Sequence, residues 1–177
     1  MLNRAAAAYH GVRLRVRLLS DVRIRHFLPT DIEEVLAIYA ASKLDELALE
    51  PVVPSLLPLT EDPARLAIFK RSEILVAEAD RPVGYIAVLG NQITGLFVHP
   101  RARGLGIGGS LLRHALSAVT EPAMLCVAAS NAPAVRLYEK HGFAVLGSFV
   151  AEYNGAHVRA LEMRRPLLSH ERKLAQA

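Results

Sequence analysis

The sequence predicts a single α/β domain of the α+β kind, with a central mixed, mostly antiparallel sheet of about six or seven strands and about four flanking helices. Three observations support this prediction. Short runs typical of strands recur along the chain, and amphipathic helical stripes separate only some of them. The chain has 177 residues, enough for one domain with a substantial core. Because helices and strands alternate only in part, a fully parallel sheet is not expected.

The first part of the chain is predicted to begin with a strand at 23–27, where side chains alternate in polarity. A capping box, Thr30-Asp-Ile-Glu33, starts a helix that runs to about Lys43. Residues 44–60 contain three prolines and an acidic cluster, so we expect a long irregular segment with room for one short helix. Asp62-Pro63 begins a second helix, because proline suits the first helical position.

Two strands at 73–78 and 83–89 are predicted to form a hairpin, and a third strand follows at 93–98. Gly95 interrupts this third strand, which indicates a bulge or a close backbone approach. The chain then continues with a helix, a short buried strand, a second helix and a final hairpin. Asn154-Gly155 joins that hairpin and is typical of a two-residue turn. The predicted ranges of these five elements are about 107–119, 124–128, 132–141, 143–153 and 157–163.

Charge is unevenly distributed along the chain. Residues 1–25 hold six arginines and one acid, whereas the remainder has 15 basic and 16 acidic side chains and is nearly neutral. A nucleic-acid partner is therefore not expected. We interpret 1–21 as an N-terminal extension, 22–168 as the domain and 169–177 as a C-terminal tail. The Ala- and Arg-rich extension resembles a targeting peptide, but it lacks a cleavage site or apolar core, which favours a flexible extension or a start codon placed too far upstream.

Three classes of protein are disfavoured by composition. No apolar run approaches the roughly 18 residues that span a membrane, so no membrane partner is expected. The single cysteine, Cys126, excludes an internal disulfide and fits a cytoplasmic location. No group of His, Cys, Asp and Glu has the spacing of metal ligands, so no metal is expected.

The most informative segment is a basic, glycine-rich turn within 98–112. It lies between a strand and a helix, so it can offer backbone N–H groups and a helix N-terminus to a phosphate. Gly104, Gly106 and Gly109 satisfy the dinucleotide pattern G-x-G-x-x-G, but the next strand ends in Ala129-Ser-Asn131, without the acid that binds the ribose. No P-loop arrangement is present.

A different spacing in this turn, Arg103-x-x-Gly106-x-Gly108, resembles the R/Q-x-x-G-x-G/A motif of the GCN5-related N-acetyltransferases, the GNAT family. A second segment, Asn131-Ala-Pro-Ala134-Val-Arg-Leu-Tyr138-Glu-Lys-His-Gly-Phe143, looks like the family signature N-x-x-A-x-x-[FL]-Y-x-x-x-G-F. Residues 131, 134 and 138 share one helix face. The order of elements matches the family from about Val22 to Leu167, so the resemblance covers most of the chain.

The resemblance implies direct transfer of an acetyl group from acetyl-CoA, as co-substrate, to a primary amine of a small-molecule or peptide acceptor. Tyr138 would be the catalytic residue, a general acid that protonates the departing thiolate. Backbone N–H groups near Val98 would polarise the thioester carbonyl. The turn would hold the pyrophosphate and the preceding strand would pair with the pantetheine arm. The cofactor-binding residues implied in this way are Leu96, Phe97, Val98, Arg103, Gly104, Leu105, Gly106, Ile107, Gly108, Gly109, Asn131 and Ala134.

The general base is not identified by the sequence. Relatives that acetylate ribosomal protein N-termini use a glutamate where Cys126 stands here, so a different base or a water relay is expected. Cys126 itself is interpreted as a core residue. Glu78, at the end of a strand, is interpreted as a surface residue. The acidic cluster of Asp45, Glu46 and Glu50 is compatible with a site for a cationic amine and equally with a solvated loop. Tyr39 is compatible with the acceptor site, although core packing is favoured, and His157 is compatible with a place near the acceptor.

Alternative functions remain open. The chain is compatible with a catalytically idle acyl-CoA sensor or interaction module, and with a transferase of a longer acyl group. An RNA-linked acetyltransferase is disfavoured by the nearly neutral domain. A homodimer is compatible with the final two strands, by analogy with similar folds.

Overall fold

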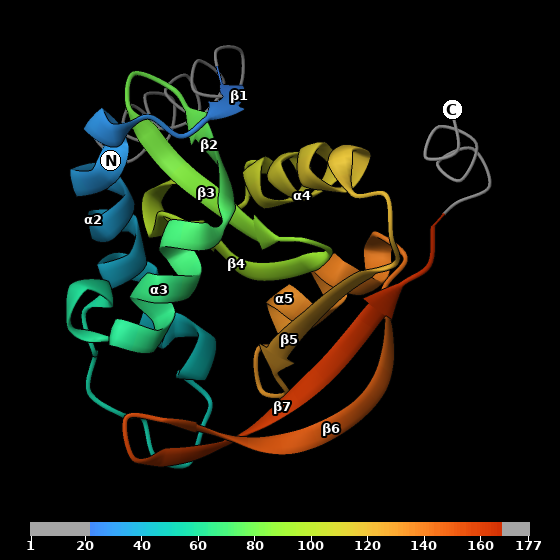
Figure 1. The fold of residues 1–177 in the computed structure, drawn as a ribbon. Coiled ribbons are helices and arrows are strands. Elements are labelled where there is room, and N and C mark those ends of the chain that lie inside the picture. The colour runs from blue at the N-terminus through green and yellow to red at the C-terminus, as the bar shows by residue number, and fades with distance from the viewer. Residues whose placement is uncertain (1–21, 168–177) are drawn as a thin grey trace, which may run out of the picture.

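The computed structural model describes residues 22–167, and its seven strands form one mixed sheet in the order β1-β2-β3-β4-β5-β7-β6 (Figure 1). All neighbouring strands are antiparallel except β4 and β5. The predicted α/β class and mostly antiparallel sheet are therefore confirmed. The strands are β1 (Arg23–His26), β2 (Glu73–Glu78), β3 (Pro82–Leu89), β4 (Gln92–Val98), β5 (Ala123–Ala128), β6 (Ala144–Tyr153) and β7 (Ala156–Arg165).

Four α-helices in the described part of the chain cover the two faces of the sheet, with α2 and α3 on one face and α4 and α5 on the other (Figure 1). The irregular segment at 44–60 contains the short helix that was allowed for, η2. The α-helices are α2 (Ile32–Ser42), α3 (Pro63–Arg71), α4 (Ile107–Ala118) and α5 (Ala132–Lys140); the 3-10 helices are η1 (Pro29–Asp31), η2 (Lys43–Leu47), η3 (Leu59–Glu61) and η4 (Pro100–Ala102).

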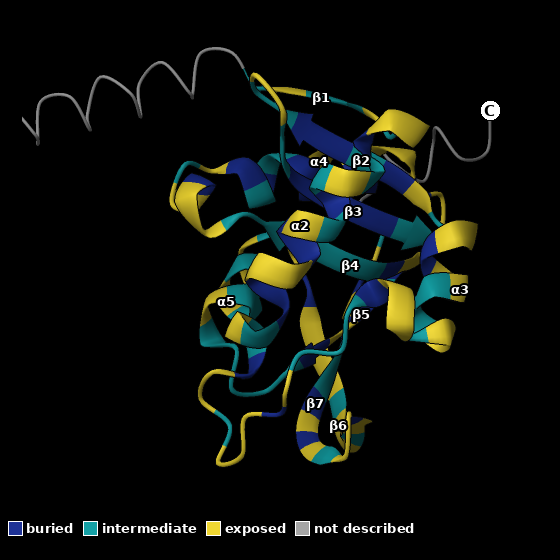
Figure 2. Ribbon diagram, turned by 90° about the vertical axis from the view of Figure 1, so that its left-hand side faces the viewer, coloured by how far each residue is buried: buried dark blue, intermediate teal, exposed yellow. Residues whose placement is uncertain are grey.

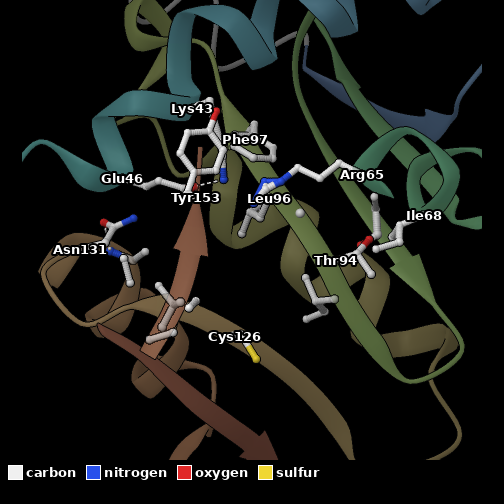
Figure 3. A pocket seen from close by; sticks show the side chains of 18 of the residues that line it. Lys43, Glu46, Arg65, Ile68, Thr94, Leu96, Phe97, Cys126, Asn131 and Tyr153 are labelled. Atoms are coloured by element: carbon white, nitrogen blue, oxygen red, sulfur yellow. Dashed lines mark hydrogen bonds and ion pairs between the residues drawn. The ribbon is translucent and has the colours of Figure 1, made fainter. Parts of the chain in front are cut away.

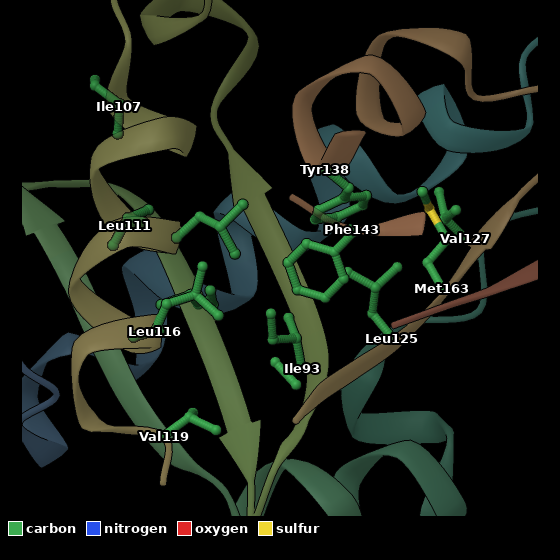
Figure 4. Close-up of a cluster of buried hydrophobic side chains, with 14 of the residues drawn as sticks. Ile93, Ile107, Leu111, Leu116, Val119, Leu125, Val127, Tyr138, Phe143 and Met163 are labelled. Atoms are coloured by element: carbon green, nitrogen blue, oxygen red, sulfur yellow. The ribbon is translucent and has the colours of Figure 1, made fainter. Parts of the chain in front are cut away.

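The central strands are buried on both faces (Figure 2). Ile86 on β3 points to the core beneath α4 and α5, whereas its neighbour Tyr85 points to the core beneath α2 and α3. Successive side chains of a strand alternate between faces, so one strand contributes to both cores. The first core is centred on the fully buried Leu111, Leu125 and Met163 (Figure 4).

The first α-helix of the domain, α2, does not begin with the predicted capping box. Neither Thr30 nor Glu33 caps it, and the 3-10 turn η1 precedes α2. The carboxylate of Asp31 accepts a hydrogen bond from the backbone N–H of Leu28 at 2.8 Å. Arg25 on β1 binds both oxygens of the same carboxylate, at 2.6 and 2.8 Å. Arg25 of β1 thus holds the Asp31 carboxylate at the start of the helix. The spacing of residues within the helix does not reveal this contact.

The final hairpin has the predicted turn. Asn154 and Gly155 both have positive φ, 46° and 80°, as a two-residue hairpin turn of this type requires. Outside the described residues lie the predicted extension at 1–21, the predicted tail at 169–177 and the predicted domain end at 168. Among residues 22–167 there is no helix with the length and apolar character needed to cross a bilayer.

Acid is expected to weaken the fold through Glu78, which was considered as a base and instead pairs with Arg23 and Arg25, each at 2.6 Å. Hydrogen bonds from Arg25 and then Arg23 lower the pKa of Glu78 to about 2. A carboxylate whose pKa is depressed in the folded state stabilises that state above its unfolded pKa of roughly 4.3, and this contribution is lost as pH falls towards 2.

Urea unfolding at a series of pH values tests this expectation. Glu78→Gln should lower the unfolding free energy near neutral pH and reduce its dependence on pH between about 5 and 2. Glu73→Gln on the same strand is the matched control, because Glu73 is exposed and has no ion-pair partner among the described residues. Equal pH dependence of the two variants would contradict the expectation.

Candidate active site

The sheet separates between its two parallel strands. β4 and β5 pair only at Gln92 with Met124 and at Ile93 with Leu125. Gly95 lies at an irregularity, since Ala87 pairs with Gly95 whereas the next residue of β3, Val88, pairs with Ile93. Here the predicted bulge is confirmed. Beyond it, the edge of β4 that faces β5 has no partner strand in the described part of the chain.

A cavity of about 540 Å³ occupies this separation (Figure 3). Helices from both faces of the sheet contribute to its walls, namely α2 and α3 on one face and α5 on the other. The cavity therefore passes through the sheet rather than lying on one side of it. Among the predicted site residues, those that line it are Leu96, Phe97, Asn131, Ala134 and Tyr138.

The start of α5 fixes two of these side chains. Asn131 is the N-cap, and its carbonyl oxygen accepts a hydrogen bond from the N–H of Ala134 at 3.3 Å. This leaves the amide N–H₂ of Asn131 available to donate into the cavity. The proline at the start of α5 suits its first turn.

Tyr138 lies two turns further along α5 and is 7 % exposed. Its ring packs edge-on against Phe143 at 5.8 Å, and its hydroxyl has no hydrogen-bond partner among residues 22–167. Burial, and to a lesser degree the Glu46 carboxylate, raise the pKa of Tyr138 above its ordinary value. The phenol therefore keeps its proton at neutral pH and can donate it into the cavity.

The glycine-rich turn has the geometry of an anion site. Gly104 and Gly106 have φ of 73° and 77°, and a Cβ at either position would meet no atom within 4 Å. The glycines are needed for backbone conformation rather than for space. Gly106 is the N-cap of α4 without a side-chain cap from the described residues, and the N–H of Ser110 makes the bond to its carbonyl at 3.0 Å. The N–H groups before Ser110 therefore lie free at the positive end of the helix.

The other predicted residues of this turn contribute packing as well as backbone. Ile107 is buried in the core and Leu105 packs against it. A Cβ on Gly109 would lie 3.4 Å from the His141 ring, and one on Gly108 would lie 3.5 Å from Leu137. These are ordinary van der Waals distances, so space alone does not require glycine at either position.

Residues 70–145 match the family model described as the acetyltransferase (GNAT) domain. This part of the chain is similar to a GNAT acetyltransferase domain. The matched range holds the separated strands, the glycine-rich turn, Asn131 and Tyr138. The resemblance carried by the two sequence motifs is therefore confirmed.

Individual relatives agree with this family. The chain is 38% identical over 99 residues to the peptidyl-lysine N-acetyltransferase YjaB of Escherichia coli K12, covering 56% of this chain and 60% of that protein. The matched segment thus spans three fifths of that relative. The solution structure of apo YjaB has a TM-score of 0.62 at 28% identity, covering 81% of this chain and 96% of that chain.

Two further solved structures share the fold. A GCN5-related N-acetyltransferase from Rhodopseudomonas palustris has a TM-score of 0.69 at 21% identity, covering 83% of this chain and 96% of that chain. A phosphinothricin acetyltransferase from Sinorhizobium meliloti, solved in complex with AcCoA, has a TM-score of 0.64 at 22% identity over 82% of this chain and 88% of that chain.

The arginine of the glycine-rich turn contacts the acidic segment before α3. Arg103 Nη1 lies 2.6 Å from Asp45 Oδ2, and Arg103 Nε donates to the carbonyl of Val98 at 3.0 Å. Ser42 Oγ donates to the same carbonyl at 3.2 Å. Val98 and Arg103 lie beside the cavity rather than on its wall, at the end of β4 where the turn begins.

The acidic segment is neither a simple solvated loop nor a single amine site. Asp45 pairs with Arg103, Glu46 pairs with Lys43 at the cavity wall, and Glu50 accepts a hydrogen bond from Ser130. The segment is also held by the final hairpin, because the N–H of Leu57 donates to the Tyr153 hydroxyl at 3.1 Å.

Among the cavity side chains that sequence reasoning missed are Lys43, Arg65 and Tyr153. They come from η2, α3 and β6, and no local spacing links them. Tyr39 was interpreted as a core residue; it is indeed buried, and it also lines the cavity. His157 is exposed and is absent from the cavity wall. In the described range, no cluster of His, Cys, Asp and Glu is arranged to hold a metal ion.

The interpretation of Cys126 as a core residue is wrong. Its neighbours Leu125 and Val127 point into the core beneath α5, so the alternation along β5 turns Cys126 to the cavity, where its thiol is exposed (Figure 3). Cys126 pairs in register with Glu162 on β7. Partial burial, and secondly this carboxylate, raise the pKa of the thiol.

Maleimide labelling tests the placement of Cys126. The thiol is the only one in the chain, and we expect it to react in the native protein, more slowly than free cysteine because its raised pKa reduces the thiolate fraction. Acetyl-CoA is expected to slow the reaction further, because the thiol lines the same cavity as Tyr138. Cys126→Ser is the control for background labelling. A thiol that reacts only after denaturation would contradict the placement.

Proposed function

We propose that this GNAT domain transfers an acetyl group from acetyl-CoA to a primary amine of a small-molecule or peptide acceptor. One observation carries the proposal: the cavity is lined by the free edge of β4 and by the protonated phenol of Tyr138, and the uncapped start of α4 follows the end of β4 beside it. These are the groups needed to bind a pyrophosphate, align an extended thioester arm and protonate a leaving thiolate. The name of the relative YjaB, a peptidyl-lysine N-acetyltransferase, supports an amine acceptor.

The residues present fit acetyl-CoA from its phosphates to its thioester. The N–H groups around Gly106 and the Arg103 guanidinium would bind the pyrophosphate, with Arg103 exchanging its exposed partner Asp45 for phosphate. The pantetheine arm would lie along Leu96–Val98. Asn131 would donate a hydrogen bond to it, and the small Ala134 would leave it room.

The transfer is balanced in protons and electrons. The lone pair of the neutral amine forms the new C–N bond, and the C–S bond breaks with its electron pair on sulfur. The amine nitrogen then releases one proton and the departing sulfur takes up one, which Tyr138 supplies. Backbone N–H groups near Val98 would stabilise the developing oxyanion.

The free, exposed Cys126 is consistent with a cytoplasmic location.

The proposal is tested by combining binding with turnover. Acetyl-CoA should raise the melting temperature of the protein, because it binds only the folded state. A panel of primary amines should then release free CoA thiol in an amine-dependent manner. Absence of a melting shift would overturn the cofactor assignment. A shift without thiol release for any amine would instead favour the acyl-CoA sensor.

A further inference from the structure

The end of the cavity beneath α2 and α3 gathers two cations around one aromatic ring (Figure 3). Lys43 Nζ lies 4.9 Å and Arg65 Cζ lies 4.6 Å from the centre of the Tyr153 ring. The Lys43 side chain is only 11% exposed and that of Arg65 is 33% exposed. Both side chains reach the cavity from separate elements, η2 and α3, and their charged groups lie near the same ring.

A third donor at this end is the buried hydroxyl of Tyr39. Tyr39 is 3% exposed, and its hydroxyl makes no hydrogen bond of normal geometry with any described residue. Burial, and secondly the neighbouring Tyr153 side chain, raise the pKa of Tyr39. An unsatisfied buried hydroxyl costs free energy of roughly 1–3 kcal/mol, so such a group requires an explanation. The Tyr39 ring packs on Phe97 at 5.4 Å between centroids, and this contact fixes the ring beside the cavity.

Hydrogen-bond donors outnumber acceptors at this end of the cavity. Lys43 gives one of its three N–H groups to Glu46, and Arg65 pairs through Nε with Asp62 at 3.2 Å. The Nη1 and Nη2 groups of Arg65 have no hydrogen-bond partner in the described part of the chain. Glu46 is already paired, and the other carboxylate on the wall belongs to an exposed residue of β6, Glu152.

We infer that the acceptor carries a carboxylate, which binds at this end of the cavity to Arg65, Lys43 and the Tyr39 hydroxyl. An ionised carboxylate only accepts hydrogen bonds and has about four lone-pair positions, so it complements this donor set. The planar guanidinium of Arg65 suits a carboxylate in particular. The inference rests on the proposed acetyl transfer and narrows its acceptor to an amino acid.

The position of this carboxylate subsite sets the length of the acceptor. Lys43 Nζ lies 6.0 Å from the centre of the Phe97 ring, and Phe97 belongs to the strand expected to carry the thioester. The amine and the carboxylate of the acceptor are therefore separated by only a few bonds. Ile68, Leu96 and Phe149 line the same cavity and offer an apolar surface to the rest of the molecule.

Matched acceptors test the carboxylate directly. L-leucine, L-leucinamide and isoamylamine share an apolar skeleton, and only the first carries a carboxylate; L-phenylalanine, its amide and phenethylamine repeat the comparison. With acetyl-CoA in excess, each acid should give a kcat/KM at least about 10-fold above its amide and its plain amine, the factor expected from one lost charge-assisted hydrogen bond. An amidated lysine peptide represents the competing acceptor class and should react more slowly than the acids.

Equilibrium binding provides a readout that does not depend on turnover. N-acetyl-L-leucine, which resembles the product, should bind the protein, whereas N-acetyl-L-leucinamide should not. Arg65→Gln should weaken binding of N-acetyl-L-leucine by about 10-fold or more, and Tyr39→Phe by a smaller factor of about 3–10. Tyr39→Phe removes a hydroxyl without a partner in the described structure, so the fold should persist. Arg71→Gln is the matched control, since Arg71 is exposed on the same helix and lies off the cavity wall.

The outcomes separate the two proposals. Amides, plain amines or the lysine peptide reacting as well as the acids would overturn the carboxylate subsite, and so would equal binding by Arg65→Gln and Arg71→Gln. In those cases acetyl-CoA binding and amine-dependent thiol release would still stand. If the unaltered protein neither binds acetyl-CoA nor releases thiol, the proposed function fails, whatever the result with N-acetyl-L-leucine.

Discussion

Gly106→Glu is expected to abolish detectable acetyl-CoA binding while the domain still folds. Gly106 has φ of 77° and is the N-cap of α4, so a side chain there places a carboxylate beside the N–H groups that would bind the pyrophosphate. Like charges about 4 Å apart at a protein surface repel by roughly 4 kcal/mol, so the Kd should rise by a factor of at least about 100. The melting shift caused by acetyl-CoA measures this effect.

Gly106→Glu also strains the backbone and adds a negative charge, and a control variant must separate these effects from the loss of the phosphate site. Gly90 has φ of 61°, and a Cβ there would also meet no atom within 4 Å, but it lies at the opposite end of β4 from the glycine-rich turn. Both glutamate variants should lose about 1–2 kcal/mol of unfolding free energy from the left-handed backbone. Only Gly106→Glu should lose the acetyl-CoA shift. If Gly90→Glu loses it equally, the turn is not the phosphate site.

Tyr138→Phe is expected to lower kcat by roughly 100-fold or more while the Kd for acetyl-CoA changes little. The phenol keeps its proton because burial raises its pKa, and it faces the cavity from the last turn of α5. Its hydroxyl binds no other described residue, so the substitution removes the proton donor without removing a structural contact. Pre-steady-state thiol release separates the chemical step from product release.

Two results would contradict this role. An unchanged kcat would show that sulfur takes its proton elsewhere, and a loss of acetyl-CoA binding in step with kcat would indicate a packing tyrosine. The ring contact with Phe143 should survive in the phenylalanine variant, so the unfolding free energy should stay close to that of the parent protein. Tyr153→Phe tests a second hydroxyl of the cavity, which receives the N–H of Leu57 and should affect stability instead.

The fold was largely predictable from local pattern. Alternating polarity located the strands, and Asn154-Gly155 and Gly142 have the positive φ that their positions in a turn and after a helix require. The start of α2 was not predictable in the same way, because Arg25 and Asp31 select the cap across two elements. Here the predicted capping by Thr30 and Glu33 is replaced by the ion pair that Arg25 of β1 forms with Asp31.

The candidate site likewise has one part that local sequence predicts and one part that depends on contacts between distant elements. The half proposed to bind the cofactor follows from contiguous motifs, since a turn and one face of a helix place Gly106, Asn131 and Tyr138. The half proposed to bind the acceptor depends on Lys43, Arg65 and Tyr153, which only the tertiary structure unites. Cys126 was misassigned because an apolar strand was assumed to be buried on both faces, whereas one face of β5 looks into the cavity.

The separation of β4 from β5 has a mechanical consequence. Among the described residues, only two residue pairs between β4 and β5 join strands β1 to β4 with strands β5 to β7. The hydrogen bonds between strands make a sheet resist bending. The sheet should therefore bend most easily where β4 separates from β5. A ligand bound between β4 and β5 would contact both parts of the sheet and restrict their relative motion. Binding should therefore slow hydrogen exchange not only at Leu96–Val98 but also at amides of β3 and β7, on either side of the separated strands.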